Sequence, residues 1–258
     1  MVRQAAGAIS AALLNDCIHL QTIRLPLSES MYSDSEEGFV ADRAIGWQGG
    51  PQETCRYLLP LVKQVLQSTD TLSIEGAQKS PSTSSGLVAR VREQILLDFD
   101  GSALLTSECP LGPRGDAQAL LQPNTDDYYS KVMKQVENQL MVPPKDDTSD
   151  ETSRLFLLVN PAWKSADSFG IFGRRRAQTE ILDRYEITYA VDQFVIRGQK
   201  CSLLKVWPHD WCVYVANLPY DSQKDGEEAT FLGAFSTRPP YEKVDELIQQ
   251  YVQENAAK

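Results

Sequence analysis

Leu155-Phe-Leu-Leu-Val-Asn-Pro-Ala-Trp163 is the stretch of sequence that decides the fold. It begins with an uninterrupted apolar run, which is the pattern of a strand in a parallel sheet whose two faces are both covered. Asn160 and Pro161 end the strand. Asn160 is therefore expected at the carboxyl edge of the sheet, where ligands of open α/β folds usually bind.

The segments around this strand predict a single α/β domain over residues 1–258. Two further β-prone runs, residues 21–27 and 117–122, are expected beside it in a mostly parallel central sheet. Pro60 lies within an expected helix, which it should end or kink because it removes a backbone hydrogen bond. Apolar residues at helical spacing predict helices that flank the sheet, at residues 3–18, 51–66, 125–140 and 241–254.

The last third of the chain is expected to extend the sheet with antiparallel strands. Gly198 and Pro208 mark reversals between short β-rich runs. The low-complexity serine-rich segment at about 77–87 is expected to be a mobile loop, and residues 141–153 a polar connector. The β-rich runs cover residues 187–191, 194–197, 201–207, 211–217 and 231–235.

The composition is that of a globular chain and excludes some partners. With 258 residues, 42% of them apolar, the chain is long enough to bury a sizeable core. Its formal net charge of -10 argues against nucleic-acid binding, which depends on cationic side chains that neutralise phosphates. No apolar run approaches the roughly 20 residues that a membrane-spanning helix needs, so no transmembrane segment is expected.

The cysteines and histidines predict no metal centre. The 5 cysteines are odd in number and widely spaced, without a Cys-x-x-Cys pair, which favours a reducing compartment. Only His19 and His209 are available to complete a metal set, and no motif places either of them. The acidic residues at 146, 147 and 150 fit a solvated surface better than a metal site. We therefore expect neither a metal nor another cofactor.

Residues 94–105, Gln-Ile-Leu-Leu-Asp-Phe-Asp-Gly-Ser-Ala-Leu-Leu, have two incompatible interpretations. Asp98-x-Asp100-Gly resembles the first motif of haloacid-dehalogenase-like phosphatases, in which one Asp attacks phosphorus and the second serves as acid and base. Asp-Gly between apolar runs is also a common β-hairpin signal, with Gly101 supplying the positive φ. Such a phosphatase needs a Ser or Thr after a later strand, where this chain has Asn160. We therefore expect a hairpin and no catalytic residue, with a magnesium-dependent phosphatase as the alternative.

The arginines at positions 174–176 follow a loop and are expected to open a helix that runs to about Tyr185. Positive charges at the start of a helix oppose its macrodipole, so another interaction must favour them. Two explanations are open. Either Glu180 and Asp183, one or two turns further on, neutralise the arginines, or the arginines face an anionic partner.

Several loose motifs follow one another in a specific order. Trp47-x-Gly49-Gly50 precedes a helix, Asn160-Pro161-x-Trp163 follows the central strand, Trp207-Pro208-x-x-Trp211 lies in a strand pair, and Arg238-Pro239 precedes the last helix. This order resembles an uncharacterised domain family of plants, algae and cyanobacteria, which includes the chloroplast Low PSII Accumulation proteins and the C-terminal extension of a plastid adenylate kinase. The resemblance spans most of the chain, and the family pattern marks none of these residues as catalytic.

What the resemblance implies is a non-catalytic accessory factor of the chloroplast. Such a protein lies in the stroma or peripherally on the thylakoid membrane, and it assists assembly or accumulation of photosystem II through contacts with subunits or assembly factors. Trp and Arg dominate binding hot spots, so we expect the partner surface among residues of these types. The candidates are Trp163, Arg174, Arg175, Arg176, Trp207, Trp211 and Arg238.

Two alternatives to this partner surface stay open. Trp207 and Trp211 are instead core residues if their β-rich runs bury them, and Arg238 then forms a structural ion pair. The kinase fusion within the family also suggests a module that binds a nucleotide or another small molecule at the sheet edge near Asn160.

Overall fold

The computed structural model describes residues 1–27, 43–44, 50–71, 89–97, 101–111, 115–141, 154–216 and 229–256. They form two compact units, one from Met1–Ile23 and Pro51–Thr188 and the other from Arg24–Gly50 and Tyr189–Lys258. One domain over residues 1–258 stays a prediction. The serine-rich segment at about 77–87 lies outside the described residues, as does the connector at 141–153 apart from Met141, where a helix ends.

The first unit is built on the three strands that the sequence predicted to be parallel. In the sheet, β6 (Leu155–Val159) lies between β1 (Leu20–Arg24) and β5 (Ala117–Leu121) and is parallel to both. Antiparallel strands β4 (Ser102–Glu108) and β3 (Arg90–Leu97) follow beyond β5. The α/β class with a parallel centre and antiparallel ends is therefore confirmed.

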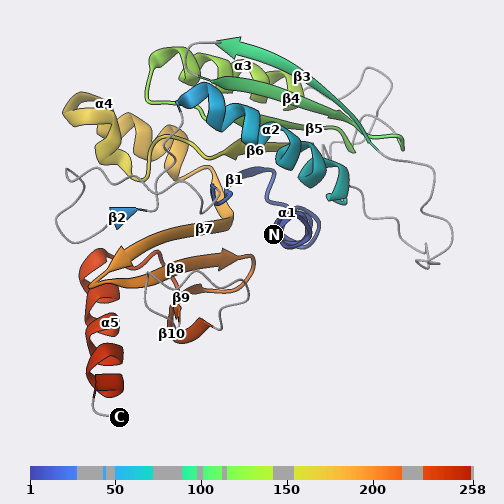
Figure 1. The fold of residues 1–258 in the computed structure, drawn as a ribbon. Helices are drawn as coiled ribbons and strands as arrows, with labels where there is room; N and C mark the ends of the chain where they lie inside the picture. Colours follow the sequence, from blue (N-terminus) through green and yellow to red (C-terminus); the bar gives the residue numbers. More distant parts are fainter. Residues whose placement is uncertain are drawn as a thin grey trace, which may run out of the picture. The chain divides into compact units, whose positions relative to one another are not determined.

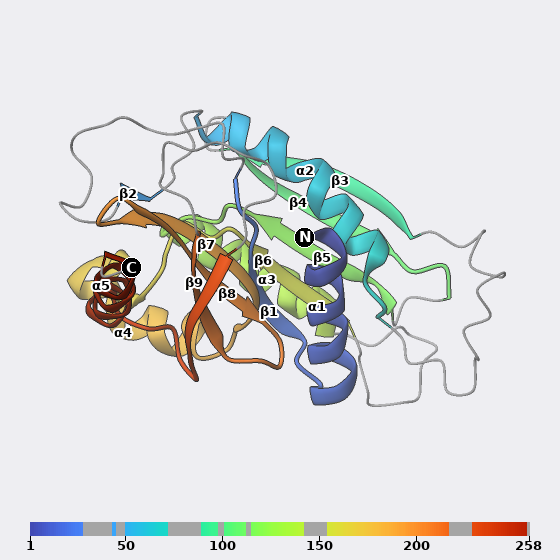
Figure 2. The same cartoon turned by 60° about the horizontal axis from the view of Figure 1, so that its bottom comes forward.

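Helices cover both faces of this sheet (Figures 1 and 2). Helices α1 (Val2–Asp16) and α2 (Pro51–Ser68) pack against each other on one face, and α3 (Asp127–Met141) lies on the other. All five residues of β6 have a relative exposure of 0%, as expected for a strand covered on both sides. We expected Pro60 to end or kink its helix. It does not end the helix, because α2 continues through this residue.

A buried glutamine joins three elements of the first unit. Gln21 of β1 is fully buried, and its side-chain amide donates to the backbone oxygens of Ile9 (3.2 Å) and Ile18 (2.8 Å). The hydroxyl of Thr188 donates to the Gln21 side-chain oxygen at 2.9 Å. This side chain satisfies the rule that buried polar groups are hydrogen-bonded, and it fixes α1 and the start of β7 (Glu186–Ile196) to β1.

The second unit contains the expected antiparallel strands. The two runs predicted at 187–191 and 194–197 are one continuous strand, β7, because the polar residues between them keep extended backbone and pair with β8. Arg197 and Gly198 have φ values of 51° and 76° and form a two-residue hairpin turn. The other elements are β2 (Arg43–Ala44), β8 (Gln199–Val206), β9 (Trp211–Ala216), β10 (Ala229–Phe235) and α5 (Tyr241–Ala256).

The hairpin interpretation of residues 94–105 is confirmed. Strands β3 and β4 are antiparallel and Leu97 pairs with Ser102 across the turn. Gly101 has a φ of 66°, and a Cβ at this position would lie 2.1 Å from the backbone oxygen of Pro51, at the start of α2. Only glycine therefore fits where the hairpin passes the helix.

Replacing Gly101 tests this close approach. Gly101→Ala is expected to lower the free energy of unfolding by about 2 to 4 kcal/mol, because the left-handed φ and the backbone clash both oppose a Cβ. The matched control is Gly7→Ala in α1, where no atom lies within 4 Å of the added Cβ. It should leave stability unchanged or raise it by up to about 1 kcal/mol. Urea unfolding monitored by circular dichroism makes the comparison, and equal losses in both variants would contradict the account.

Candidate functional site

Helix α4 (Gly170–Ala177) carries the three predicted arginines. It follows the 3-10 turn η2 (Ala166–Phe169) and continues into the π-helical segment η3 (Gln178–Leu182). The prediction that the arginines open the helix is wrong, because α4 begins at Gly170 and the arginines lie in its last turn. Because the helical run continues through η3 to Leu182, the arginines lie in its middle, where the macrodipole neither opposes nor specifically favours positive charge.

Opposite sides of α4 have different surroundings. Ile171, Arg174 and Arg175 are spaced i, i+3 and i+4 and share one side, where Ile171 is 91% exposed. The Arg174 guanidinium forms an ion pair with Asp167 at 3.1 Å. We call these three helix residues the outer face. Residues of the other side, which include Phe172, Gly173, Arg176 and Ala177, line a pocket.

The pocket has a volume of about 300 Å³ and lies at the carboxyl edge of two adjacent parallel strands. Residues 124–126, which follow β5 and lead into α3, form one wall, and Trp163, which follows β6, forms another. Asn160 ends β6 at this edge, as predicted, with a φ of 46° and its backbone N–H donating to Ile23 O at 2.9 Å. The pocket therefore occupies the place where open α/β folds usually bind ligands.

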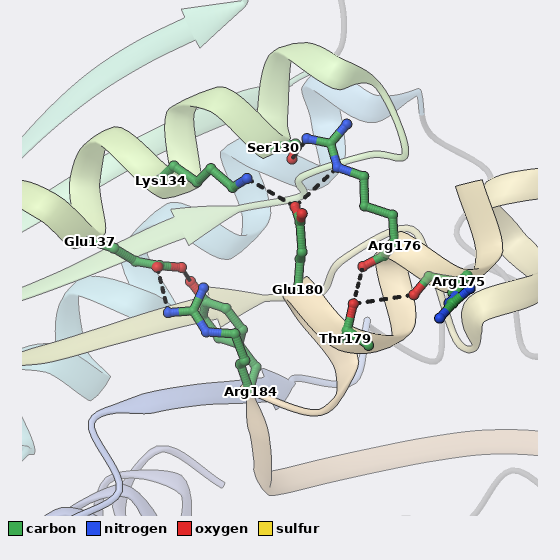
Figure 3. A network of polar contacts seen from close by, with 9 residues as sticks. Ser130, Lys134, Glu137, Arg175, Arg176, Thr179, Glu180 and Arg184 are labelled. Atoms are coloured by element: carbon green, nitrogen blue, oxygen red, sulfur yellow. Dashed lines mark hydrogen bonds and ion pairs between the residues drawn. The ribbon is translucent and has the colours of Figure 1, made fainter. Parts of the chain in front are cut away.

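Glu180 lies between two cations beside the pocket (Figure 3). Its carboxylate accepts a hydrogen bond from Lys134 Nζ at 2.9 Å and one from Arg176 Nε at 3.0 Å. These bonds, that from Lys134 first, lower the pKa of Glu180. Arg176 also donates to Ser130 Oγ at 3.5 Å. The expected neutralisation by Glu180 therefore occurs for Arg176. Asp183 does not take part in it, because its carboxylate accepts a hydrogen bond from Gln178 at 2.5 Å.

A second carboxylate holds η3 and the residues after it against α3. Glu137 is 7% exposed, accepts a hydrogen bond from Arg184 at 2.7 Å and accepts another from the Tyr185 hydroxyl. Burial, followed by the neighbouring Glu137 charge, raises the pKa of Tyr185 well above its ordinary value. The spacing of Glu137 in the sequence could have indicated that it is buried. It lies one helical turn after Met133, on the side of α3 that faces the core.

Trp163 is a core residue. It is 2% exposed, and its ring packs against Phe169 with centroids 5.3 Å apart. It belongs to a cluster with residues of β5, β6, α3 and η3, and Pro161 beside it is also buried. Trp163 therefore contributes to the pocket wall and not to an exposed partner surface.

The other candidate residues belong to the second unit. Trp211 is buried, as the core alternative required, and Trp207 is half-buried with the Lys205 ammonium 5.3 Å from its ring centre. Arg238 donates to Asp192 at 2.9 Å and 3.1 Å. This is the structural ion pair that we gave as the alternative to a role of Arg238 in a partner surface. Of the flanking prolines, Pro208 is exposed after a cis peptide bond and Pro239 is buried.

Two sets of predicted residues lie outside the described part of the chain. These are Gly49, beside the described Gly50, and the phosphatase-like pair Asp98 and Asp100. The strands on either side of that pair form a hairpin, whereas the phosphatase motif expects a helix directly after its strand. Phosphatase activity stays an untested alternative.

The apolar residues of α4 were not among the site residues predicted from the sequence. Ile171 and Phe172 are 91% and 102% exposed, although both are large and apolar. Their signal in the sequence is an apolar pair between Gly170 and Gly173, directly before the arginines. We expected only a loop there, because so short a segment shows no helical period.

The described residues contain neither a metal-ligand cluster nor a disulfide. They include no group of three or more His, Cys, Asp or Glu side chains that could hold a metal ion. All five cysteines are described, and none of them forms a disulfide bond. Within the same residues, no helix combines the length and apolar character needed to cross a membrane.

The sequence model of one family, described as Domain of unknown function (DUF1995), matches residues 1–246. The chain belongs to the DUF1995 family. This family carries no assigned catalytic activity, and the predicted membership of an uncharacterised domain family is thereby confirmed. No curated protein and no solved structure is significantly similar to this DUF1995 chain.

Removal of the buried carboxylate should destabilise the chain. Glu137→Ala is expected to lower the free energy of unfolding by about 2 to 4 kcal/mol, because the buried Tyr185 hydroxyl then loses its acceptor. Glu180→Ala is the matched control, since that carboxylate also binds two groups but is partly exposed to solvent and should matter less. Chemical unfolding of both variants measures the difference. A loss for Glu180→Ala as large as that for Glu137→Ala would count against the proposed role of burial.

Stability at high pH should depend on Tyr185. Its pKa is raised in the folded chain, so unfolding releases a proton above the ordinary tyrosine pKa of about 10, and stability falls as pH rises further. Below about pH 10, Tyr185 is protonated in both the folded and the unfolded chain and does not make the free energy of unfolding depend on pH. Tyr185→Phe should therefore show a shallower alkaline loss of stability, by up to about 1.4 kcal/mol per pH unit. Urea unfolding at a series of pH values would refute this if both proteins gave the same slope.

Proposed function

We propose that this chain is a non-catalytic accessory factor of the chloroplast that binds a photosystem II subunit or assembly factor. The observation that carries the proposal is the exposed apolar residue Ile171 beside Arg174 and Arg175 on the outer face of α4. The resemblance to Low PSII Accumulation proteins supports the choice of partner. The Phe172 side chain, at the rim of the pocket, extends the apolar area.

Exposed apolar side chains at this position favour a protein contact. Large apolar residues scattered singly are common on surfaces, but Ile171 is almost fully exposed beside two arginines on the same helix face, a combination typical of residues that a partner buries. Burying a side chain such as Ile171 or Phe172 contributes about 1.5 to 3 kcal/mol. A side chain of this kind supplies the apolar centre of a small interface.

Charge favours an acidic partner. The chain has a net charge of -10, yet Arg175 places positive charge beside Ile171, whereas Arg174 is paired with Asp167. Opposite charges across an interface speed association and fix its orientation. The partner surface expected here is therefore acidic at its rim, has an apolar pocket for Ile171, and lies on the stromal side of the thylakoid membrane.

Capture from solubilised thylakoid membranes tests the proposal. The tagged chain should retain a photosystem II subunit or assembly factor, identified by mass spectrometry, and Ile171→Ser with Arg175→Glu should reduce the retained amount about tenfold or more. Neither substituted residue lines the pocket, so the change is confined to the outer face.

The matched control carries Phe231→Ser and Arg56→Glu. Phe231 of β10 is 54% exposed and Arg56 of α2 is also exposed, so the control likewise replaces one exposed apolar residue by Ser and one exposed Arg by Glu, away from α4. It should retain as much partner as the unmodified chain. The proposal fails if no photosystem II protein is retained, or if the outer-face variant and the control behave alike.

A further inference from the structure

Thr179 is the only Ser or Thr of the chain that has an arginine three residues before it. That arginine is Arg176, and Arg174 and Arg175 precede it directly. Many protein kinases select their substrates by such a pattern of positive charge on the amino-terminal side of the acceptor hydroxyl. Because so short a motif also arises by chance, the hydroxyl must in addition be accessible and lie in a segment that a kinase can bind.

The hydroxyl of Thr179 is accessible. Thr179 is exposed to solvent in η3, directly after α4 (Figure 3). Its hydroxyl shares its proton between the backbone oxygens of Arg175 and Arg176, one turn earlier, at 3.3 Å each. These hydrogen bonds are long, and such bonds from Thr to the preceding turn slightly destabilise a helix. The folded chain therefore loses little when this hydroxyl reacts.

The segment that ends at Thr179 can open locally. Ala177 is the one buried residue of α4, and the next buried side chain, Ile181, follows the acceptor. A helix of 8 residues is too short to be stable by itself, and segments with few buried apolar contacts open at small cost. Residues 174–179 can therefore take the extended form in which kinases bind their substrates, while Ile181 keeps its place in the core.

Arg175 is placed to bind a phosphate on Thr179. Each of the other two arginines of α4 has an acidic partner, but within the described part of the chain no carboxylate forms an ion pair with Arg175. Thr179 follows Arg175 by one helical turn, i to i+4, so the two side chains are neighbours. A phosphate here carries a charge of about −1.5 to −2 and would meet this guanidinium.

We propose that Thr179 is a phosphorylation site for a protein kinase that selects arginine on the amino-terminal side of its acceptor. Oγ1 of Thr179 attacks the γ-phosphorus of ATP and forms the new O–P bond. The bond between that phosphorus and the bridging oxygen breaks, ADP leaves, and the hydroxyl proton passes to the base of the kinase. The phosphate then pairs with Arg175.

The phosphate also weakens docking through the outer face. Thr179 follows Ile171 by about two helical turns and therefore lies on the same side of the helix as the outer face. Phosphorylation neutralises Arg175 and adds negative charge where the partner is expected to be acidic, so like charges then oppose each other. This effect rests on the proposed docking function, whereas the modification itself does not.

Treatment of the full chain with a kinase tests the modification. The chain is incubated with ATP and a calcium/calmodulin-dependent protein kinase, which selects an arginine three residues before its acceptor. Trypsin then releases residues 177–184, in which Thr179 is the only hydroxyl-bearing residue, so mass spectrometry assigns the phosphate. Arg176→Gln should slow phosphorylation of Thr179 about tenfold or more, and the control Arg56→Gln should leave its rate unchanged. The proposal is overturned if Thr179 gains no phosphate, or if both variants react at the same rate.

Capture from solubilised thylakoid membranes tests the effect on docking. The phosphorylated chain should retain about tenfold less partner than the untreated chain. Thr179→Val, shown by circular dichroism to fold, should retain equal amounts with and without kinase treatment, because it cannot accept the phosphate. Equal retention by the phosphorylated and the untreated chain would contradict the effect on docking. If the untreated chain retains no photosystem II protein, the docking function and its control by phosphate both fail, and phosphorylation of Thr179 stands by itself.

Discussion

Burial of β6 on both faces is the constraint on which the first unit depends. Five consecutive apolar side chains, Leu155–Val159, have no contact with water, so helices must cover both sides of the sheet at this strand. On one side, α3 and the segment that follows Trp163 supply this cover, with Met133 and Ile181 in the same cluster as Phe156. The chain after β6 is therefore drawn back over the sheet, and the pocket forms where it meets the start of α3.

A buried polar contact then fixes the position of the returning segment. Apolar packing alone does not select one register of η3 on α3, whereas Glu137 accepts bonds from Arg184 and Tyr185 in one arrangement. Such directional contacts in a low-dielectric interior make alternatives costly, because each would leave a buried group without a partner. The position of α4, which precedes η3, follows from this anchoring.

The sequence predicted the strands well because their signal is local. The run at Leu155–Val159 and the Asp-Gly turn before Ser102 depend on residue types within a few positions. No local signal of this kind indicates which residues of α4 are exposed and which line the pocket. Whether Ile171 is exposed, or Glu137 buried, depends on contacts with residues far away in the chain, and the arginines were assigned to the wrong end of a helix because its start lies in a glycine-flanked segment without a period.

The two sides of α4 give the account its functional content. One side lines the pocket through Arg176, and the other exposes Ile171 to solvent. The most direct test places the photo-reactive amino acid benzoylphenylalanine at position 171 of the chain in intact chloroplasts. The account predicts a cross-linked product that contains a photosystem II subunit or assembly factor, and no such product when the same group replaces Arg56. Absence of that product from position 171, or the same product from both positions, would contradict the account.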